Sequence, residues 1–199
     1  ADIIVGSDTS MMTTTNWDNM TRFDQIPSGY VKFDQAITGS GTIYLRSGAM
    51  RFDDANNQFT NLNIVVEGSF DDTRGLQLWG TGWRLSTATI TIQDSATDIG
   101  DSGRLFVDNW HADAEVATVI LKNQGGITFG GGEHLQINTR FAGDGSVRLG
   151  NDGHIDILST ATIEPGSSIG SLGVDDLKLE NTAQYIWELG PSGADVINV

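Results

Sequence analysis

The 199-residue sequence contains no cysteine and only three prolines. Because there is no thiol, neither disulfide bonds nor thiolate metal ligands can stabilise the fold. The prolines, Pro27, Pro165 and Pro191, each have a glycine within the next two residues. Proline lacks a backbone donor and is favoured in turns followed by glycine, so we expect all three outside strands. No apolar run reaches the length of a membrane span, and we expect no membrane insertion.

Basic residues are also scarce: 11 Lys and Arg face 26 Asp and Glu, a formal net charge of -15. A field of this sign repels phosphate backbones, so we expect no nucleic-acid partner. Aspartate supplies 20 of the acids and glutamate only 6. Aspartate favours turns because its short carboxylate bonds nearby backbone amides, whereas glutamate favours helices. Together with 25 glycines, this bias predicts many short strands joined by turns.

Apolar and polar residues alternate in many short segments, including Thr89–Asp94, His154–Leu158 and Tyr185–Leu189, which predicts half-buried strands. Two segments, Thr38–Gly48 and Ala142–Gly153, share a Gly-x-Gly-[Thr/Ser]-[Ile/Val]-x-Leu unit. A unit this short buries its apolar face only by stacking on neighbours. Most gaps are longer than a two-residue hairpin turn. We therefore predict an all-β parallel solenoid with roughly 22 residues per coil, and keep a β-sandwich as the alternative.

Three parts of the chain differ in composition. Residues 1–37 are rich in Met, Thr and Asn and poor in glycine, and we expect them to cap the open end of the solenoid. Within them Asn16–Ile26 is the best helical candidate. Residues 38–159 are expected to form the solenoid body, and residues 160–199 its C-terminal coils.

Residues 160–199 read TATIEPGSSIGSLGVDDLKLENTAQYIWELGPSGADVINV. This segment resembles the passenger-associated repeat of bacterial autotransporter proteins. The matching residues are Pro165, Gly166, Ser168, Ile169, Gly170, Leu172, Leu177, Leu179, Tyr185, Glu188, Leu189, Asp195, Ile197 and Val199. The resemblance implies a right-handed parallel β-helix exposed outside a bacterium. It identifies no activity, because such passengers include adhesins, matrix proteins and some hydrolases.

Two acidic segments are candidates for structural calcium, the one cofactor that the sequence suggests. Turns crowded with carboxylates and carbonyls suit a hard, oxygen-seeking cation. Neither segment matches the EF-hand loop or the Gly-Gly-x-Gly-x-Asp nonapeptide. The candidate ligands are Asp94, Asp98 and Asp101 in the first segment and Asp144, Asp152 and Asp156 in the second.

Catalytic patterns are weak. His111, His134 and His154 are far apart in sequence and lack a paired spacing, so we expect isolated surface or turn residues. Adjacent acids such as Asp71 and Asp72 would point to opposite faces of a strand rather than form a dyad. We therefore expect no enzyme, and keep a polysaccharide-active β-helix enzyme as the alternative.

Exposed aromatic residues suggest binding surfaces instead. Trp79, Trp83 and Trp110 would form a carbohydrate-facing strip if exposed, which keeps a carbohydrate-binding module among the alternatives. The final strands carry no polar cap, which predicts an assembly edge. Its candidate residues are Tyr185, Trp187, Val196, Ile197 and Val199. The function that we expect is that of a secreted bacterial surface or extracellular-matrix protein, which mediates adhesion or self-assembly with other copies of itself, surface proteins or glycans.

Overall fold

The computed structural model describes residues 3–5, 30–33, 38–45, 49–52, 58–67, 76–79, 84–93, 104–108, 114–122, 125–129, 134–144, 146–148, 153–166 and 169–199. All regular secondary structure in these ranges is β-strand. Over the same residues, no helix has the length and apolarity needed to cross a membrane. The helical candidate Asn16–Ile26 and most of the expected cap lie outside the described residues, and the cap stays a prediction.

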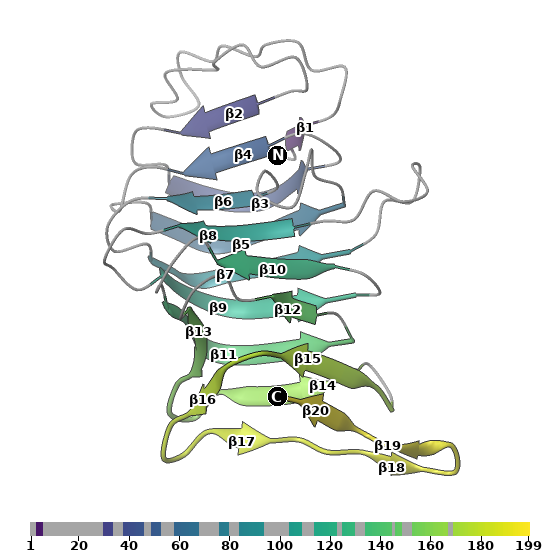
Figure 1. Ribbon diagram of the computed structural model, residues 1–199. Coiled ribbons are helices and arrows are strands. Elements are labelled where there is room, and N and C mark those ends of the chain that lie inside the picture. The colour runs from purple at the N-terminus through teal and green to yellow at the C-terminus, as the bar shows by residue number, and fades with distance from the viewer. Residues whose placement is uncertain are drawn as a thin grey trace.

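Two large sheets form the body of the molecule (Figure 1). The first sheet follows the order β1 (Ile3–Val5), β3 (Thr38–Leu45), β5 (Gln58–Val66), β7 (Arg84–Ile92), β9 (Ala114–Leu121), β11 (His134–Gly143), β13 (His154–Ile157) and β16 (Leu177–Leu179), with β14 (Thr162–Pro165) and β17 (Gln184–Tyr185) beside this path. The second sheet follows the order β2 (Tyr30–Phe33), β4 (Ala49–Phe52), β6 (Leu76–Trp79), β8 (Arg104–Asp108), β10 (Gly126–Phe129), β12 (Ser146–Arg148), β15 (Ser171–Val174) and β20 (Val196–Asn198). A small third sheet pairs β18 (Leu189–Gly190) with β19 (Gly193–Ala194).

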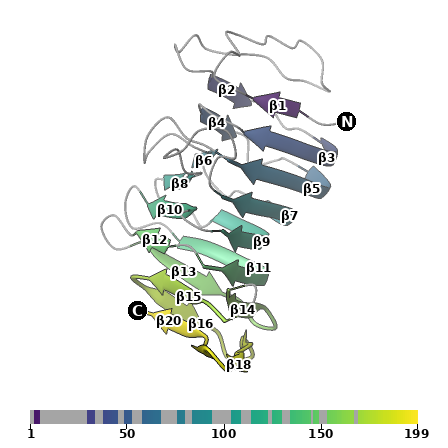
Figure 2. The ribbon, with the colours of Figure 1, turned by 90° about the vertical axis from the view of Figure 1, so that its right-hand side faces the viewer.

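The chain alternates between the two large sheets, and every strand pairing within them is parallel. Figure 2 shows the sheets side by side along the stack. In Figure 1 the strands β4, β6 and β10 run leftward in front, while β3, β5 and β9 run rightward behind as the chain descends. The coil is therefore right-handed. The predicted parallel β-solenoid is confirmed, and the β-sandwich alternative is wrong because its strands would pair antiparallel.

Columns of apolar side chains fill the space between the sheets. One core ladder joins Ile43, Ile64, Ile90, Val119, Phe141 and Ile163 in successive rungs of the first sheet. Each of these side chains is at most 1 % exposed. Full burial of such a side chain contributes roughly 1.5–3 kcal/mol relative to leaving it exposed. Ladder neighbours are 21 residues apart at one extreme (64 − 43) and 29 at the other (119 − 90), so no fixed repeat length is visible in the sequence.

The long strand β11 turns a corner that the next rung divides between two strands. Its first half pairs with β13 and its second half with β14. Pro165 is the last residue of β14, so the expectation that all prolines lie outside strands is wrong here. The missing donor is tolerated because the last paired residue of β14 is Glu164. The next residue, Gly166, donates its N–H to the carbonyl of Gly143 at 2.6 Å.

Candidate functional site

Two histidines and an aspartate meet on the outer side of the first sheet. Parallel pairing sets His134 of β11 beside His154 of β13, and the centroids of the two rings lie 3.6 Å apart. Side chains alternate along a strand, so Ile155 points into the core while His154 and Asp156 point outward. The donor atoms of these three polar residues all lie within 4.8 Å of one another. The two histidines are therefore neighbours, contrary to the expectation of isolated residues.

Asp156 is the buried member of this cluster. Its side chain is 3 % exposed, against 19 % for His154 and 36 % for His134. The Oδ2 atom lies 3.6 Å from His134 Nδ1, and Oδ1 lies 3.2 Å from His154 Nε2. Among the described residues Oδ1 nevertheless has no hydrogen-bond partner. Burying a carboxylate oxygen without a hydrogen bond is costly, so this atom is suited to accept a further ligand.

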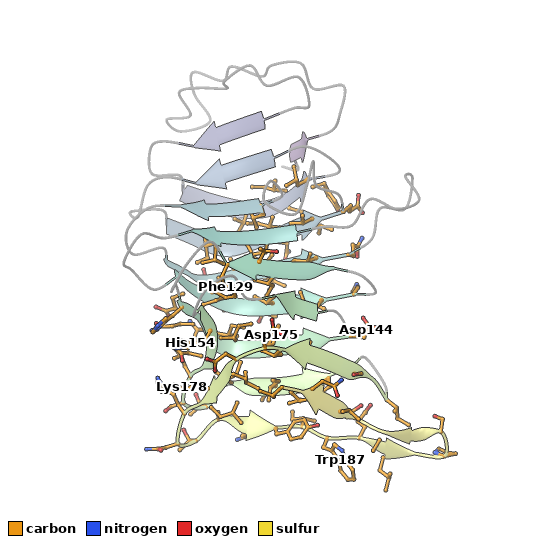
Figure 3. The ribbon with its side chains drawn as sticks, viewed as in Figure 1. Phe129, Asp144, His154, Asp175, Lys178 and Trp187 are labelled. Atoms are coloured by element: carbon orange, nitrogen blue, oxygen red, sulfur yellow. The ribbon has the colours of Figure 1, made fainter. Side chains whose placement is uncertain are left out.

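Lys178 of β16 adds a third turn of the solenoid to the cluster. It pairs with Asp156 in the sheet, and its Nζ lies 3.5 Å from Asp156 Oδ1. Its side chain is 60 % exposed, so the ammonium can leave the carboxylate for solvent without a change in the backbone. Figure 3 shows Lys178 and His154 on the same side of the solenoid. The arrangement is suited to an ion-pair cluster or to binding of a cation.

The predicted calcium ligands do not gather at one place. Asp94, Asp98, Asp101 and Asp152 lie outside the described residues. Asp156 pairs with Gln136 near the start of β11, whereas Asp144 follows the end of that strand. Eight residues of strand separate the two positions by about 26 Å at 3.3 Å per residue. Figure 3 shows Asp144 on the side of the solenoid opposite His154, so Asp144 and Asp156 cannot bind the same ion.

The end of the stack formed by β16, β17 and β20 presents a second candidate site. Fully buried Ile163 is followed on the core ladder by Tyr185, which is 43 % exposed. Fully buried Ile157 is likewise followed by Leu179, which is 48 % exposed. In the part of the chain that the structure describes, no strand lies beyond β16, β17 or β20. Positions that face the core in earlier turns are therefore partly open to solvent in the last one.

Exposed large apolar side chains concentrate at this end. Over the described residues they are Leu179, Tyr185, Ile186, Trp187, Leu189, Val196 and Val199, which we call the terminal patch. Trp187 projects from the C-terminal end of the stack in Figure 3. The structure thus places four of the five predicted edge residues on the patch, whereas Ile197 packs against the core opposite Leu172. Leu179, Ile186 and Leu189 were missing from the prediction.

Asp195 holds the backbone beneath the terminal patch. It is 6 % exposed, and its Oδ1 accepts the Gly170 N–H at 2.9 Å. Its Oδ2 accepts the Glu188 N–H at 2.8 Å, and its carbonyl accepts the indole N–H of Trp187 at 3.0 Å. Burial and, secondarily, the charge of Asp195 raise the pKa of Tyr185 above its ordinary value of 10.0. One buried carboxylate thus fixes the segment that carries much of the patch.

The predicted carbohydrate strip stays a prediction. Trp83 and Trp110 lie outside the described residues. For Trp79 the structure describes only the backbone, as the last residue of β6.

Comparison with known proteins adds no relative, since no family model, curated protein or solved structure matches this chain. The function is therefore argued from the two sites and from the sequence.

Proposed function

We propose that this protein is a secreted bacterial structural protein that builds a surface or matrix assembly by end-to-end association of β-solenoids. The observation that carries the proposal is the open end of the core ladder. Tyr185 and Leu179 continue columns whose preceding members are fully buried. A further rung placed on this end would bury them, as every earlier rung buries the one before it.

The occupant that we propose for this end is a second copy of the chain. A parallel strand edge offers unpaired backbone groups to another strand of the same spacing. The described strands β1 and β2 are the last members of the two sheets at the opposite end of the stack. The end strands of a second copy therefore match the terminal patch in strand geometry.

The energy of such an association is consistent with a reversible contact. The seven side chains of the terminal patch are between 43 % and 80 % exposed. Burying the exposed part of each contributes about 1 kcal/mol, roughly half of a full burial, or about 7 kcal/mol together. Association costs roughly 4–15 kcal/mol in lost freedom. Apolar burial alone therefore about offsets this cost, and hydrogen bonds between strand edges decide the affinity.

Two features of the sequence support a location outside a bacterial cell. Residues 160–199 resemble the passenger-associated repeat of autotransporter proteins. The chain also uses no cysteine and carries a net charge of -15, which favours solubility. Surface exposure predicts that protease added to intact host cells degrades the protein, while an intracellular marker survives. Full protection of the protein under these conditions would contradict a surface location.

Sedimentation velocity at a series of concentrations tests the association. We expect the wild-type chain to form dimers or longer chains, and we expect Leu179→Lys combined with Val196→Lys to remain monomeric. These residues lie in the end strands of the two sheets, β16 and β20, and lysine on an edge strand opposes pairing. The control is Asn63→Lys, which adds the same charge at an exposed position of β5.

A monomeric wild-type chain at every concentration would refute the proposal. So would a double variant that associates as strongly as the wild type while its circular dichroism is unchanged. A dimer would indicate that two C-terminal ends pair, and longer chains would indicate pairing with the opposite end.

A further inference from the structure

We infer that His134, His154 and Asp156 form a binding site for a divalent transition-metal ion, for which Zn²⁺ is the best-suited probe. Three observations carry this inference: the spacing of the donor atoms, the buried carboxylate oxygen without a hydrogen bond, and the chemistry of the donor set. The inference is independent of the association proposed above, because the cluster lies on the side of the solenoid.

The spacing fits a tetrahedral ion. Zinc binds imidazole nitrogen and carboxylate oxygen at about 2.0–2.1 Å, which places neighbouring ligand atoms about 3.3 Å apart. The observed separations are 3.6 Å between His134 Nδ1 and Asp156 Oδ2 and 3.2 Å between His154 Nε2 and Asp156 Oδ1. The carboxylate thus offers one oxygen to the side of each imidazole. Rotation of the exposed His134 ring by a small angle is enough to complete the geometry.

Asp156 is the element that distinguishes this cluster from a surface ion pair. A surface carboxylate is satisfied by water, but the Asp156 side chain is 3 % exposed and its Oδ1 has no hydrogen-bond partner in the described residues. An ion bound to this atom would compensate both its charge and its missing hydrogen bond. The neighbouring imidazoles would supply the nitrogen ligands that borderline metals prefer.

The donor set also discriminates among cations. Calcium and magnesium take oxygen ligands almost entirely, whereas imidazole suits zinc, copper, nickel and iron. Two nitrogen ligands and one carboxylate therefore favour Zn²⁺ over Ca²⁺ here, and the site differs in kind from the calcium sites that the aspartates suggested. Three protein ligands leave a fourth position for water or for a ligand from a partner.

Lys178 competes with the ion for the same oxygen. Its Nζ lies 3.5 Å from Asp156 Oδ1, and a bound cation would repel it. Because this side chain is largely exposed, it can turn to solvent when the ion binds. Lys178→Gln is therefore expected to increase zinc affinity about fivefold, the attraction of two unit charges about 4 Å apart in water. Loss of a structural ion pair alone would not produce this gain.

Isothermal titration calorimetry with ZnCl₂, and with CaCl₂ in parallel, tests the site. We expect one zinc ion per chain, and weak or no heat from calcium. His154→Gln and His134→Gln should each lower zinc affinity at least tenfold, because each removes a ligand. Asp144→Asn is the matched control, since it removes an exposed carboxylate at the other end of β11 and should leave the affinity unchanged.

A Co²⁺ titration supplies a readout that does not depend on folding energy. The visible absorption of bound Co²⁺ should show four-coordination in the wild type and should be lost in His154→Gln. Absence of zinc binding would overturn the inference. Binding that both histidine variants leave unchanged, or that Lys178→Gln weakens, would also overturn it.

Discussion

Replacing Asp195 is expected to release the C-terminal segment without unfolding the rest of the solenoid. The carboxylate accepts backbone N–H groups from Gly170 and Glu188, which are 18 residues apart (188 − 170). A hydrogen bond to a charged group contributes about 1.5–3 kcal/mol, so Asp195→Ala should cost roughly 3–6 kcal/mol. Asp195→Asn keeps one acceptor oxygen and should cost about half as much.

The loss should be local because each turn of a solenoid contacts only its neighbours. Amide hydrogen exchange measures it directly. In Asp195→Ala the amides of Gly170 and Glu188 should exchange at least about 100-fold faster, since 3 kcal/mol corresponds to slightly more than two powers of ten. The amide of Val119, deep in the core ladder, should keep its wild-type rate.

Asp176→Asn provides the control, because this exposed carboxylate lies in the same region of the chain and its loss should change neither amide. Two results would refute the reasoning. Unchanged exchange at Gly170 and Glu188 would mean that the carboxylate does not hold these strands. Equal acceleration at Val119 would mean that the solenoid unfolds as one unit, and that the nearest-neighbour argument is wrong.

Three further predictions concern stability. Gly143→Ala should lower the urea midpoint by about 1–3 kcal/mol or more, because φ is +118° and the new Cβ would lie 1.7 Å from the Leu121 carbonyl oxygen; an unchanged midpoint contradicts this. Phe141→Ala should cost about 3–5 kcal/mol by urea unfolding, since this fully buried ring leaves a cavity. Phenolate absorbance should show Tyr185 titrating above pH 10.0, and Asp195→Asn should remove only part of the rise, because burial is the larger cause. Since the folded state holds this proton more tightly, the associated stability is complete below pH 10.0 and is lost as pH rises through the raised pKa.

Local alternation was sufficient to predict many strands of the fold. Thr89–Asp94 contributes to β7, and His154–Leu158 contains β13. By contrast, Tyr185–Leu189 was predicted as one strand, but β17 ends at Tyr185 and β18 begins at Leu189. The interruption depends on the bond from the Glu188 N–H to Asp195. A contact between two segments of the chain decided this boundary, and no local pattern specifies it.

The histidine cluster could not be found from the sequence for a related reason. The spacings tested were the short ones that place ligands on one local element. In a solenoid the relevant spacing is the length of a turn, here 20 residues from His134 to His154 (154 − 134) and 22 from Asp156 to Lys178 (178 − 156). Because other turns are longer by up to nine residues (29 − 20), the register must be known before such columns can be identified.

Other polar contacts between neighbouring turns show why the cluster at Asp156 stands apart. Glu67 accepts a hydrogen bond from Gln93 at 3.1 Å, and Glu115 accepts one from Asn138 at 2.8 Å. In each case a partly buried carboxylate is satisfied by an amide one turn away, which is sufficient to tie two rungs together. Asp156 is more deeply buried and lies beside donors from three turns, yet its Oδ1 accepts no hydrogen bond within the described residues. A column that served only to hold rungs together would be expected to resemble the other two, so this departure favours a ligand-binding role.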